Sequence, residues 1–277
     1  VPRPSTGRLS MKAVIMAGGE GTRLRPLTAH RPKPLCPVLN VPIMEHIVIL
    51  LRDAGLTDIV VTLHYLADEI QSDFGDGSDW GVSFTYSVQD TPLGTAGGLK
   101  LAEEHLRDDS FVIVSGDALT DIDLGAAIDF HRKRQSMATI VLSHVPNPLE
   151  FGVIITDDDG RIRRFLEKPS WGEVFSDTVN TGIYILEPSV FDYMELGGNY
   201  DWSQDIFPKM LAEDKPLYGY VMNDYWCDVG NLSQYREAQY TVLDGRTRVA
   251  LRGTKHNGVW VGDGSRIAPD ASIAPPS

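Results

Sequence analysis

Short apolar runs alternate with longer amphipathic stretches through the first half of the chain. Residues 12–17 read KAVIMA, an apolar run of strand length, whereas residues 43–54 space their apolar side chains three and four positions apart, as a helix does. This alternation is typical of parallel βαβ units and predicts an α/β fold with a doubly wound, Rossmann-like sheet and helices on both faces. The expected strands are 12–17, 58–63, 82–88 and 111–115, and the expected helices are 43–54, 66–74 and 95–106.

The second half of the chain is richer in strands. Asp157-Asp158-Asp159-Gly160 joins two strand-like runs, 151–156 and 162–166, and favours a hairpin turn. Because a hairpin makes an antiparallel pair, we expect a mixed sheet in which this half is laid against the first. Further strands are expected at 138–144, 179–186 and 217–222, and helices at 202–212 and 232–243.

The last segment, 246–277, carries a six-residue period. An aliphatic residue stands at Val261, Ile267 and Ile273, the spacing of a left-handed hexapeptide β-helix. A β-helix needs about three or more repeats to bury a core, and barely two are present. We expect a linker and the start of a β-helix whose coils continue in a longer protein, with its aliphatic edge packed on the preceding domain; a disordered tail is the alternative.

Composition and charge narrow the classes of partner. The chain has 277 residues, 42% of them hydrophobic, and a formal net charge of -13, which argues against a nucleic acid or a membrane surface as partner. No apolar run reaches the roughly 18 residues of a membrane span, and no signal peptide is visible. Cys36 and Cys227 lack metal-ligand spacing and indicate buried thiols in a reducing compartment. We therefore expect a cytoplasmic protein, with 1–10 as a tag remnant or disordered leader and 11–245 as its main domain.

A segment without acids stands out against this acidic background. Residues 21–44 contain no Asp or Glu, and they follow the first expected strand and the turn Gly18-Gly19-Glu20-Gly21. Glycines let a ligand approach the main chain, so successive N–H groups can form a nest for phosphate oxygens. An arginine adds a fork of donors and a lysine a point charge. The cations of the segment are Arg23, Arg25, Arg31 and Lys33.

Two familiar glycine motifs do not fit this turn. A Walker A loop needs Gly-Lys-Ser/Thr where Gly21-Thr22-Arg23 stands, and the last glycine of the dinucleotide fingerprint would fall at Arg23. The mismatch argues against a dinucleotide-dependent oxidoreductase. An ordinary strand-to-helix turn with surface cations is the alternative to a phosphate site.

Two carboxylates are candidates for holding a metal ion. Asp117 follows the strand 111–115, and Mg²⁺ takes one or two carboxylates together with phosphate oxygens and water. Asp121 and Asp123 are nearby competitors, although Asp123 suits the N-cap of a helix beginning at Leu124. Asp228 precedes a helix, so a capping role is its alternative. Three residues further along are ambiguous singly, because Glu167 and Lys168 could form an exposed ion pair and Asn180 has no distinctive neighbour.

Residues 11 to about 243 resemble the sugar-1-phosphate nucleotidylyltransferases, or NDP-sugar pyrophosphorylases. The motifs are weak one by one, but their ordered set is highly specific, and GTRLRPLT, FLEKP and NTGIYIL look most like the mannose-1-phosphate guanylyltransferases of this family. In order, the motifs are GGEGTRLRPLT at 18–28, PKP at 32–34, LGTAG at 93–97, GD at 116–117, FLEKP at 165–169, NTGIY at 180–184 and WCDVG at 226–230.

The resemblance implies a role for each candidate residue. A nucleoside triphosphate, GTP by this resemblance, and a sugar 1-phosphate, mannose 1-phosphate, would be the substrates, Mg²⁺ the cofactor, and GDP-mannose and pyrophosphate the products. The nucleotide would be held by Ala17, Gly18, Gly19, Gly21, Thr22, Arg23, Lys33, Gln89, Gly94 and Thr95. The sugar phosphate would be held by Gly152, Glu167, Lys168 and Asn180, the metal by Asp117 and Asp228, and catalysis would rest on Arg23, Lys33, Asp117 and Asp228.

Other functions are compatible with the same motifs. The substrate pair could be glucose 1-phosphate with a different NTP, or a heptose or choline phosphate. A non-catalytic, nucleotide-sugar-binding regulatory subunit could share the fold, but loss of a cation or a metal carboxylate would be expected there, and all four are present. A homo-oligomer is also compatible with the sequence.

Overall fold

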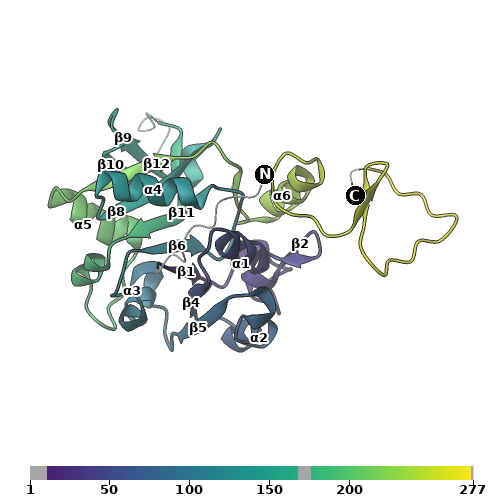
Figure 1. Ribbon diagram of the computed structural model, residues 1–277, viewed down its shortest axis with the longest axis horizontal. Coiled ribbons are helices and arrows are strands. Elements are labelled where there is room, and N and C mark those ends of the chain that lie inside the picture. Colours follow the sequence, from purple (N-terminus) through teal and green to yellow (C-terminus); the bar gives the residue numbers. More distant parts are fainter. Residues whose placement is uncertain (1–10, 168–175, 276) are drawn as a thin grey trace.

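In the computed structural model, which describes residues 11–167, 176–275 and 277, a nine-stranded sheet forms the centre of the molecule (Figure 1). Seven strands follow the order β10-β9-β11-β6-β1-β4-β5, and β8 and β12 continue the sheet from β11. The strands are β1 (Lys12–Met16), β4 (Asp58–Leu63), β5 (Ser83–Val88), β6 (Phe111–Ser115), β8 (Ala138–His144), β9 (Gly152–Thr156), β10 (Ile162–Glu167), β11 (Thr178–Leu186) and β12 (Leu217–Val221).

The first half is the predicted parallel βαβ arrangement. β1 lies between β4 and β6 and is parallel to both. Alternate side chains of β1 enter different cores: Ala13 and Ile15 join one buried cluster and Val14 the other. Because successive side chains of a strand point to opposite faces, both faces of the sheet are covered. The α-helices are α1 (Ile43–Asp53), α2 (Ala67–Phe74), α3 (Gly94–Lys100), α4 (Leu124–Arg134), α5 (Phe207–Ala212) and α6 (Leu232–Leu243).

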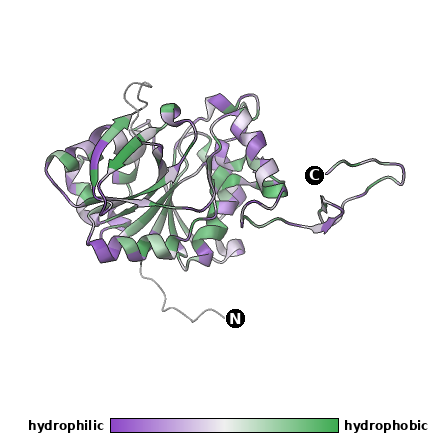
Figure 2. Cartoon of the chain, turned by 90° about the horizontal axis from the view of Figure 1, so that it is seen from above, coloured by the Kyte–Doolittle hydropathy of each residue, from purple (hydrophilic) through white to green (hydrophobic). Residues whose placement is uncertain are grey.

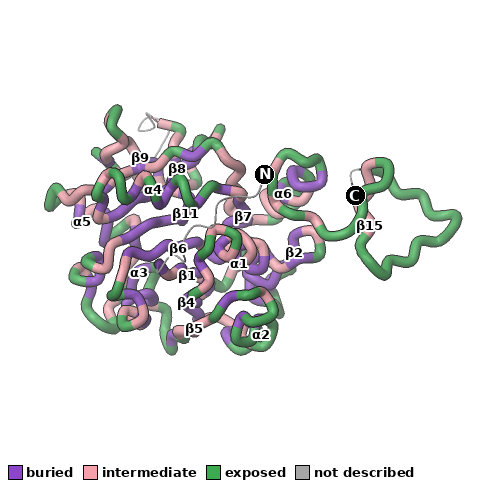
Figure 3. Tube along the Cα trace, viewed as in Figure 1, coloured by how far each residue is buried: buried purple, intermediate pink, exposed green. Residues whose placement is uncertain are grey.

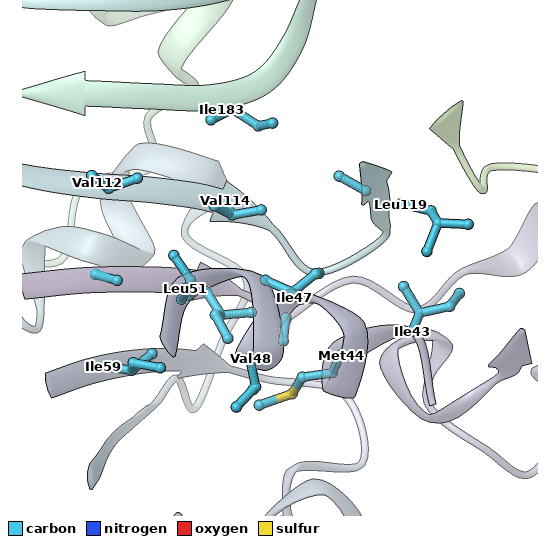
Figure 4. Close-up of a cluster of buried hydrophobic side chains, with 14 of the residues drawn as sticks. Ile43, Met44, Ile47, Val48, Leu51, Ile59, Val112, Val114, Leu119 and Ile183 are labelled. Atoms are coloured by element: carbon cyan, nitrogen blue, oxygen red, sulfur yellow. The ribbon is translucent and has the colours of Figure 1, made fainter. Parts of the chain in front are cut away.

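The apolar face of α1 shows how one of these cores is built. Ile43, Ile47 and Leu51 recur at helical spacing and are fully or almost fully buried. Figure 4 shows Leu51 and Ile47 facing Val112 and Val114 of β6, and Ile43 below Leu119. Green hydrophobic segments of the strands and helices meet inside the body in Figure 2, and the sheet is its buried centre in Figure 3. The predicted α/β fold with a mixed central sheet is confirmed.

β11 joins the two halves of the sheet. It pairs antiparallel with β8 along one edge, and along the other edge with β6 and, at Val179, with β9. The turn at 157–160 connects β9 and β10 as an antiparallel hairpin, as predicted, with Gly160 at φ +83°. Shorter pairs lie outside the large sheet: β2 (Pro37–Val38) with β3 (Val41–Pro42), and β7 (Ala118–Thr120) with β13 (Trp226–Asp228).

Two predicted helices are interrupted. The stretch 95–106 is α-helical only to Lys100 and resumes as a 3₁₀ turn at Glu103–His105, because Gly97 and Gly98 weaken the helix by about 1 kcal/mol each. The stretch 202–212 begins as a π-helix, Trp202–Ile206, before α5. Pro208 has no N–H to donate to residue 204, so the α-helical bonding pattern cannot run through unchanged. The remaining 3₁₀ turns are Thr22–Leu24, Lys33–Leu35, Ser78–Trp80, Pro148–Glu150 and Pro188–Tyr193.

The predicted β-helix is not shown. β14 (Thr254–His256) and β15 (Val259–Val261) form an antiparallel hairpin, and the described residues after it, 262–275 and 277, contain no strand. Ile267 and Ile273 are 49% and 42% exposed, so the expectation that this edge packs on the main domain is wrong. Two repeats leave the aliphatic edge without a second layer to cover it. Figure 1 shows the tail reaching away from the body.

Among the helices of the described ranges, none combines the length and apolarity that a bilayer crossing requires.

Candidate functional site

The glycine turn follows β1 at the carboxyl end of the parallel strands. Gly18 lies against the side chains of His64 and Gln89, Gly19 faces open space, and Ala17 donates its N–H to the Thr62 carbonyl at 2.9 Å. Gly21 adopts φ +63°, and a Cβ there would come within 2.9 Å of Lys33 Cβ. Glycine is therefore required at position 21 by both its conformation and its neighbour.

The two cations predicted to bind phosphate lie in different surroundings. Arg23, with Thr22 in the 3₁₀ turn after Gly21, is exposed, as expected for a residue at the edge of a site. The sequence places both cations at the edge of a cleft, but Lys33 is only 7% exposed, so this expectation is wrong for Lys33. Its Nζ contacts Asp117 Oδ2 and lies 3.5 Å from Asp228 Oδ1. The structure thus brings together Lys33, Asp117 and Asp228.

Backbone pairing explains why these carboxylates meet. Asp117 directly precedes β7 and Asp228 ends β13, and the two strands pair with Ala118 opposite Asp228. The Val229 N–H donates to the Asp117 carbonyl at 3.1 Å and extends this pairing to Asp117. The backbone before Asp117 also runs close to β1. Glycine is needed at position 116 for this, because a Cβ there would lie 2.7 Å from the Met16 carbonyl oxygen of β1.

Burial and charge act in opposite directions on the two acids. Burial alone would raise the pKa of Asp117, but the Lys33 ammonium and the Ser115 hydroxyl, whose Oγ lies 2.5 Å from Oδ1, hold this pKa below its ordinary value. Burial and the neighbouring Asp117 charge raise the pKa of Asp228, despite Lys33 and Arg23. One ammonium therefore serves two carboxylates, and the group has an excess of negative charge.

This donor set fits a divalent cation. In the described residues no cluster of three or more His, Cys, Asp or Glu side chains is arranged to hold a metal. Two carboxylates suit Mg²⁺, which completes its octahedron with phosphate oxygens and water. A metal at Asp117 and Asp228 would accordingly take its remaining ligands from water or from a phosphate-bearing ligand.

The nearby acids have structural roles. Asp123 caps α4, accepting from the Ala126 N–H at 3.0 Å, as predicted. Asp121 is not a competitor of Asp117, because its carboxylate accepts from the Tyr225 N–H at 2.8 Å and the Arg248 N–H at 2.6 Å. The helix after Asp228 is capped by Asn231, whose side chain accepts from the Gln234 N–H, so the capping alternative for Asp228 is wrong.

Of the remaining residues predicted to bind the nucleotide, Gln89 lies beside the glycine turn, against Gly18. Gln89 follows β5 and is 8% exposed, and its amide nitrogen would lie 2.2 Å from a Cβ placed on Gly98. Gly94 and Thr95 begin α3, but the Thr95 hydroxyl donates to Asp201 at 2.8 Å and is already engaged within the protein. A base-binding role for these residues stays a prediction.

The residues predicted to bind the sugar phosphate lie in the other half of the sheet. Gly152 and Asn180 line one small pocket together with Phe165 and Ser203. Asn180 donates to the Tyr184 hydroxyl at 3.0 Å and to Ser203 Oγ at 2.9 Å. Glu167 ends β10 by its backbone, and Lys168 lies outside the described residues.

Sequence reasoning missed Ser115, Gly98 and Ser203. Ser115 ends β6 two positions before Asp117, and this spacing together with the Ser-Gly-Asp order was a usable signal for its bond. Gly98 directly follows Gly97, the last residue of the motif at 93–97, and this second glycine was a usable signal. No sequence signal pointed to Ser203, because it meets Asn180 only through the packing of the π-helix on the sheet.

Comparison with known proteins identifies the family of the chain. The sequence pattern of the family described as "Nucleotidyl transferase" matches residues 12–245. The chain is 44% identical over 246 residues to a UTP–glucose-1-phosphate uridylyltransferase from Synechocystis sp., covering 84% of this chain and 63% of that relative. It is 35% identical over 264 residues to a mannose-1-phosphate guanylyltransferase from Mycobacterium tuberculosis, covering 94% of this chain and 72% of that one.

A solved structure shares the fold. The crystal structure of a putative glucose-1-phosphate thymidylyltransferase from Bacillus anthracis superposes with a TM-score of 0.78 at 30% identity, covering 88% of this chain and 98% of that one. The chain therefore spans less than two thirds of the Synechocystis relative but almost the whole of this smaller structure.

Proposed function

The chain belongs to the nucleotidyl transferase family, and on that premise we propose that it transfers a nucleotidyl group from a nucleoside triphosphate to a sugar 1-phosphate. Pyrophosphate and an NDP-sugar would be the products. The observation that carries the proposal is the group formed by Lys33, Asp117 and Asp228 beside the glycine turn. Two cations, the backbone N–H groups of the turn and two carboxylates that could hold a metal lie at the carboxyl ends of β1 and β6, where open α/β sheets bind ligands.

This reaction does not require a side chain to act as a general base. A phosphate monoester has its second pKa near about 6, so the sugar phosphate is largely dianionic at neutral pH and its oxygen is already a nucleophile. It attacks the α-phosphorus, the bond from that phosphorus to the bridging oxygen breaks, and pyrophosphate leaves in line. The barrier is the repulsion between the two anions and the charge that develops on the phosphoryl oxygens.

Each charged residue has a task in this scheme. Arg23 is exposed and can turn its planar fork toward phosphate oxygens, and Lys33 supplies an ammonium from below the Gly21 turn. Asp117 and Asp228 would hold Mg²⁺, which supplies positive charge to the phosphates when bound. Because Gln89 and Gly152 lie on opposite sides of this group in the sheet order, the base and the sugar would approach from the two halves of the sheet.

The proposed substrate pair is GTP with mannose 1-phosphate. The motifs at 18–28, 165–169 and 180–184 support this pair, as does the M. tuberculosis relative, whose name refers to guanylyl transfer to mannose 1-phosphate. UTP with glucose 1-phosphate is the second candidate, supported by the 44% identity to the Synechocystis relative.

A pyrophosphate-release assay over a matrix of NTPs and sugar 1-phosphates tests both levels of the proposal. We expect kcat/KM to be highest for GTP with mannose 1-phosphate. A clear preference for UTP with glucose 1-phosphate would reject the first pair and leave the reaction class intact. Binding of nucleotide sugars without turnover of any pair would instead identify a regulatory subunit of the same fold.

A further inference from the structure

The Lys33 ammonium occupies the same two carboxylates that the proposed function assigns to Mg²⁺. It contacts Asp117 Oδ2 and lies 3.5 Å from Asp228 Oδ1. One cation and two carboxylates carry a net charge of −1. With a divalent cation added, the group would carry +1, and the ammonium and the metal would repel each other at short range.

We propose that Lys33 is a built-in competitor of the metal, and that a nucleotide phosphate favours its release from Asp117 and Asp228 by offering its ammonium a new partner. Lys33 then has two successive partners: the carboxylates before the metal–nucleotide complex binds, and phosphate oxygens afterwards. This inference rests on the proposed function for the identity of the site.

The packing of Lys33 confines this exchange to the end of its side chain. Pro32 and Pro34 flank it and fix their own φ angles near −65°, so the backbone of this turn is restricted. The stem packs under Gly21, because a Cβ at position 21 would meet Lys33 Cβ at 2.9 Å and Cδ at 3.4 Å. Only the terminal bonds that carry Nζ remain to redirect the ammonium, and they lie directly beneath the turn expected to hold the triphosphate.

The other contacts of the carboxylates do not need to break. Ser115 donates to Oδ1 of Asp117, while Lys33 contacts Oδ2. Asp228 turns Oδ1 to Lys33, and its Oδ2 would lie 2.9 Å from a Cβ placed on Gly230. Moving one ammonium would therefore expose one oxygen of each carboxylate to a metal while the side chains keep their positions.

The exchange couples the two ligands. A metal alone must displace Lys33 without giving its charge a partner, whereas a metal with a nucleoside triphosphate supplies that partner. The affinity for the divalent cation should rise in the presence of nucleotide, and by linkage the nucleotide affinity should rise equally with the metal. Removing the ammonium should raise the affinity for the metal alone and abolish most of this coupling.

Mn²⁺ titration followed by electron paramagnetic resonance measures this directly on the full chain. We expect Lys33→Met to bind Mn²⁺ in the absence of nucleotide about tenfold or more tightly than the wild type, and to gain little from added GTP. Lys100→Met is the matched control, since Lys100 is also buried and paired, with Glu103 at 2.8 Å, and its Mn²⁺ affinity should equal that of the wild type. Equal or weaker Mn²⁺ binding by folded Lys33→Met would overturn the proposal.

A second measurement uses the unaltered protein. Acetylation by an N-hydroxysuccinimide ester, followed by mass spectrometry, reports how freely each lysine amine reacts. Mn²⁺ alone should speed the labelling of Lys33, GTP with Mn²⁺ should slow it again, and Lys100 should not respond. Unchanged or slower labelling of Lys33 with Mn²⁺ refutes the exchange even if the variant fails to fold. Neither readout requires turnover, so a protein that passes both tests without transferase activity would refute the proposed function alone.

Discussion

Arg23 and Lys33 carry the same charge on the same acid-free segment, but their surroundings give them different roles. Arg23 is exposed, and its charge partly opposes the raised pKa of Asp228. Lys33 is buried and compensates two carboxylates. Substitution of the first should affect chemistry alone, whereas substitution of the second should affect the fold as well.

For Arg23→Ala we expect kcat to fall by two to three orders of magnitude at saturating NTP, about the cost of one donor that faces developing charge. The urea midpoint should match the wild type because the side chain is exposed. Arg52→Ala, which removes an exposed cation paired with Asp53 at the end of α1, is the control and should keep full activity. Near-normal kcat in Arg23→Ala would show that Arg23 is a surface cation without a role in the reaction.

For Lys33→Ala we expect lost turnover together with a loss of about 1–3 kcal/mol in the free energy of unfolding, because two partly buried carboxylates lose their cation. Added Mg²⁺ should restore part of that stability by binding the folded state. Urea unfolding with and without Mg²⁺ measures both effects. Stability equal to the wild type in both conditions would contradict the compensating role of Lys33.

Substitutions at the three neighbouring acids Asp117, Asp228 and Asp121 should differ in their effects on turnover and stability. Asp117→Asn and Asp228→Asn keep the shape but lose the charge that Mg²⁺ needs, so turnover should be very low in both. Asp121→Asn should keep turnover per folded molecule but lower the melting temperature, because the Asp121 carboxylate ties Tyr225 and Arg248 together. The pyrophosphate assay and a thermal scan give the two readings. A stable but inactive Asp121→Asn would mean that this acid takes part in the reaction.

At the scale of elements, the apolar pattern predicted most boundaries but not the interruptions. β4, β6 and α6 begin and end where predicted, because the two strands are short, almost continuously buried apolar runs and α6 starts directly after its Asn231 cap. Pro208 and the Gly97-Gly98 pair, which interrupt these helices, stand in the sequence, but the approach of the Gly198 carbonyl to Gly97 is set by tertiary packing. The meeting of Asp117 with Asp228 depends on the β7–β13 register, which spacing along the chain cannot give.

The junction of α4 with β8 should make stability depend on pH. His131 of α4 is 1% exposed, between Thr139 at 2.9 Å and Glu187 at 3.1 Å, and burial lowers its pKa although Glu187 opposes this. The folded state thus favours the neutral ring. Its contribution is complete above the ordinary histidine pKa near about 6.5 and is lost as the pH falls below that value.

Urea unfolding of the wild type and His131→Asn at pH 7.5 and 5.5 tests this dependence. The wild type should be the more stable protein at pH 7.5, and the difference should shrink at pH 5.5, where the unfolded wild type gains a proton that the folded state resists. A difference that stays constant, or grows at pH 5.5, would show that His131 is not held neutral.

At the scale of the whole molecule, the segment after α6 has an anchored part and a free part. Arg248 pairs with Asp224 at 2.5 Å, and Arg252 pairs with Glu45 of α1, which is 5% exposed. Beyond Gly253, the hairpin and the tail lie away from the body and are largely exposed (Figure 3).

Two truncations distinguish these parts. A chain ending after Gly253 should keep the turnover and melting temperature of the full chain, because it loses little buried surface. A chain ending after Asp244 should melt several degrees lower, since Glu45 and Asp121 lose their cationic partners, while its turnover per folded molecule persists. Size-exclusion chromatography on both reports whether the hairpin mediates assembly. Lost kcat in the first chain, with unchanged fold and assembly, would place the tail in the active site.

The pairing of β7 with β13 has a consequence for synthesis of the protein on the ribosome. The phosphate turn, Lys33 and Asp117 emerge early, but their last partner, Asp228, belongs to a strand near the end of the main domain. A nascent chain that has built β1, β4, β5 and β6 therefore has only one of the two carboxylates proposed to hold the metal. One edge of β7 also lacks its partner strand, β13. Loop closure over so many residues makes this pairing a late step, so chemical competence should appear only as folding finishes. Incompletely translated or stalled chains would in this way be prevented from consuming nucleotide.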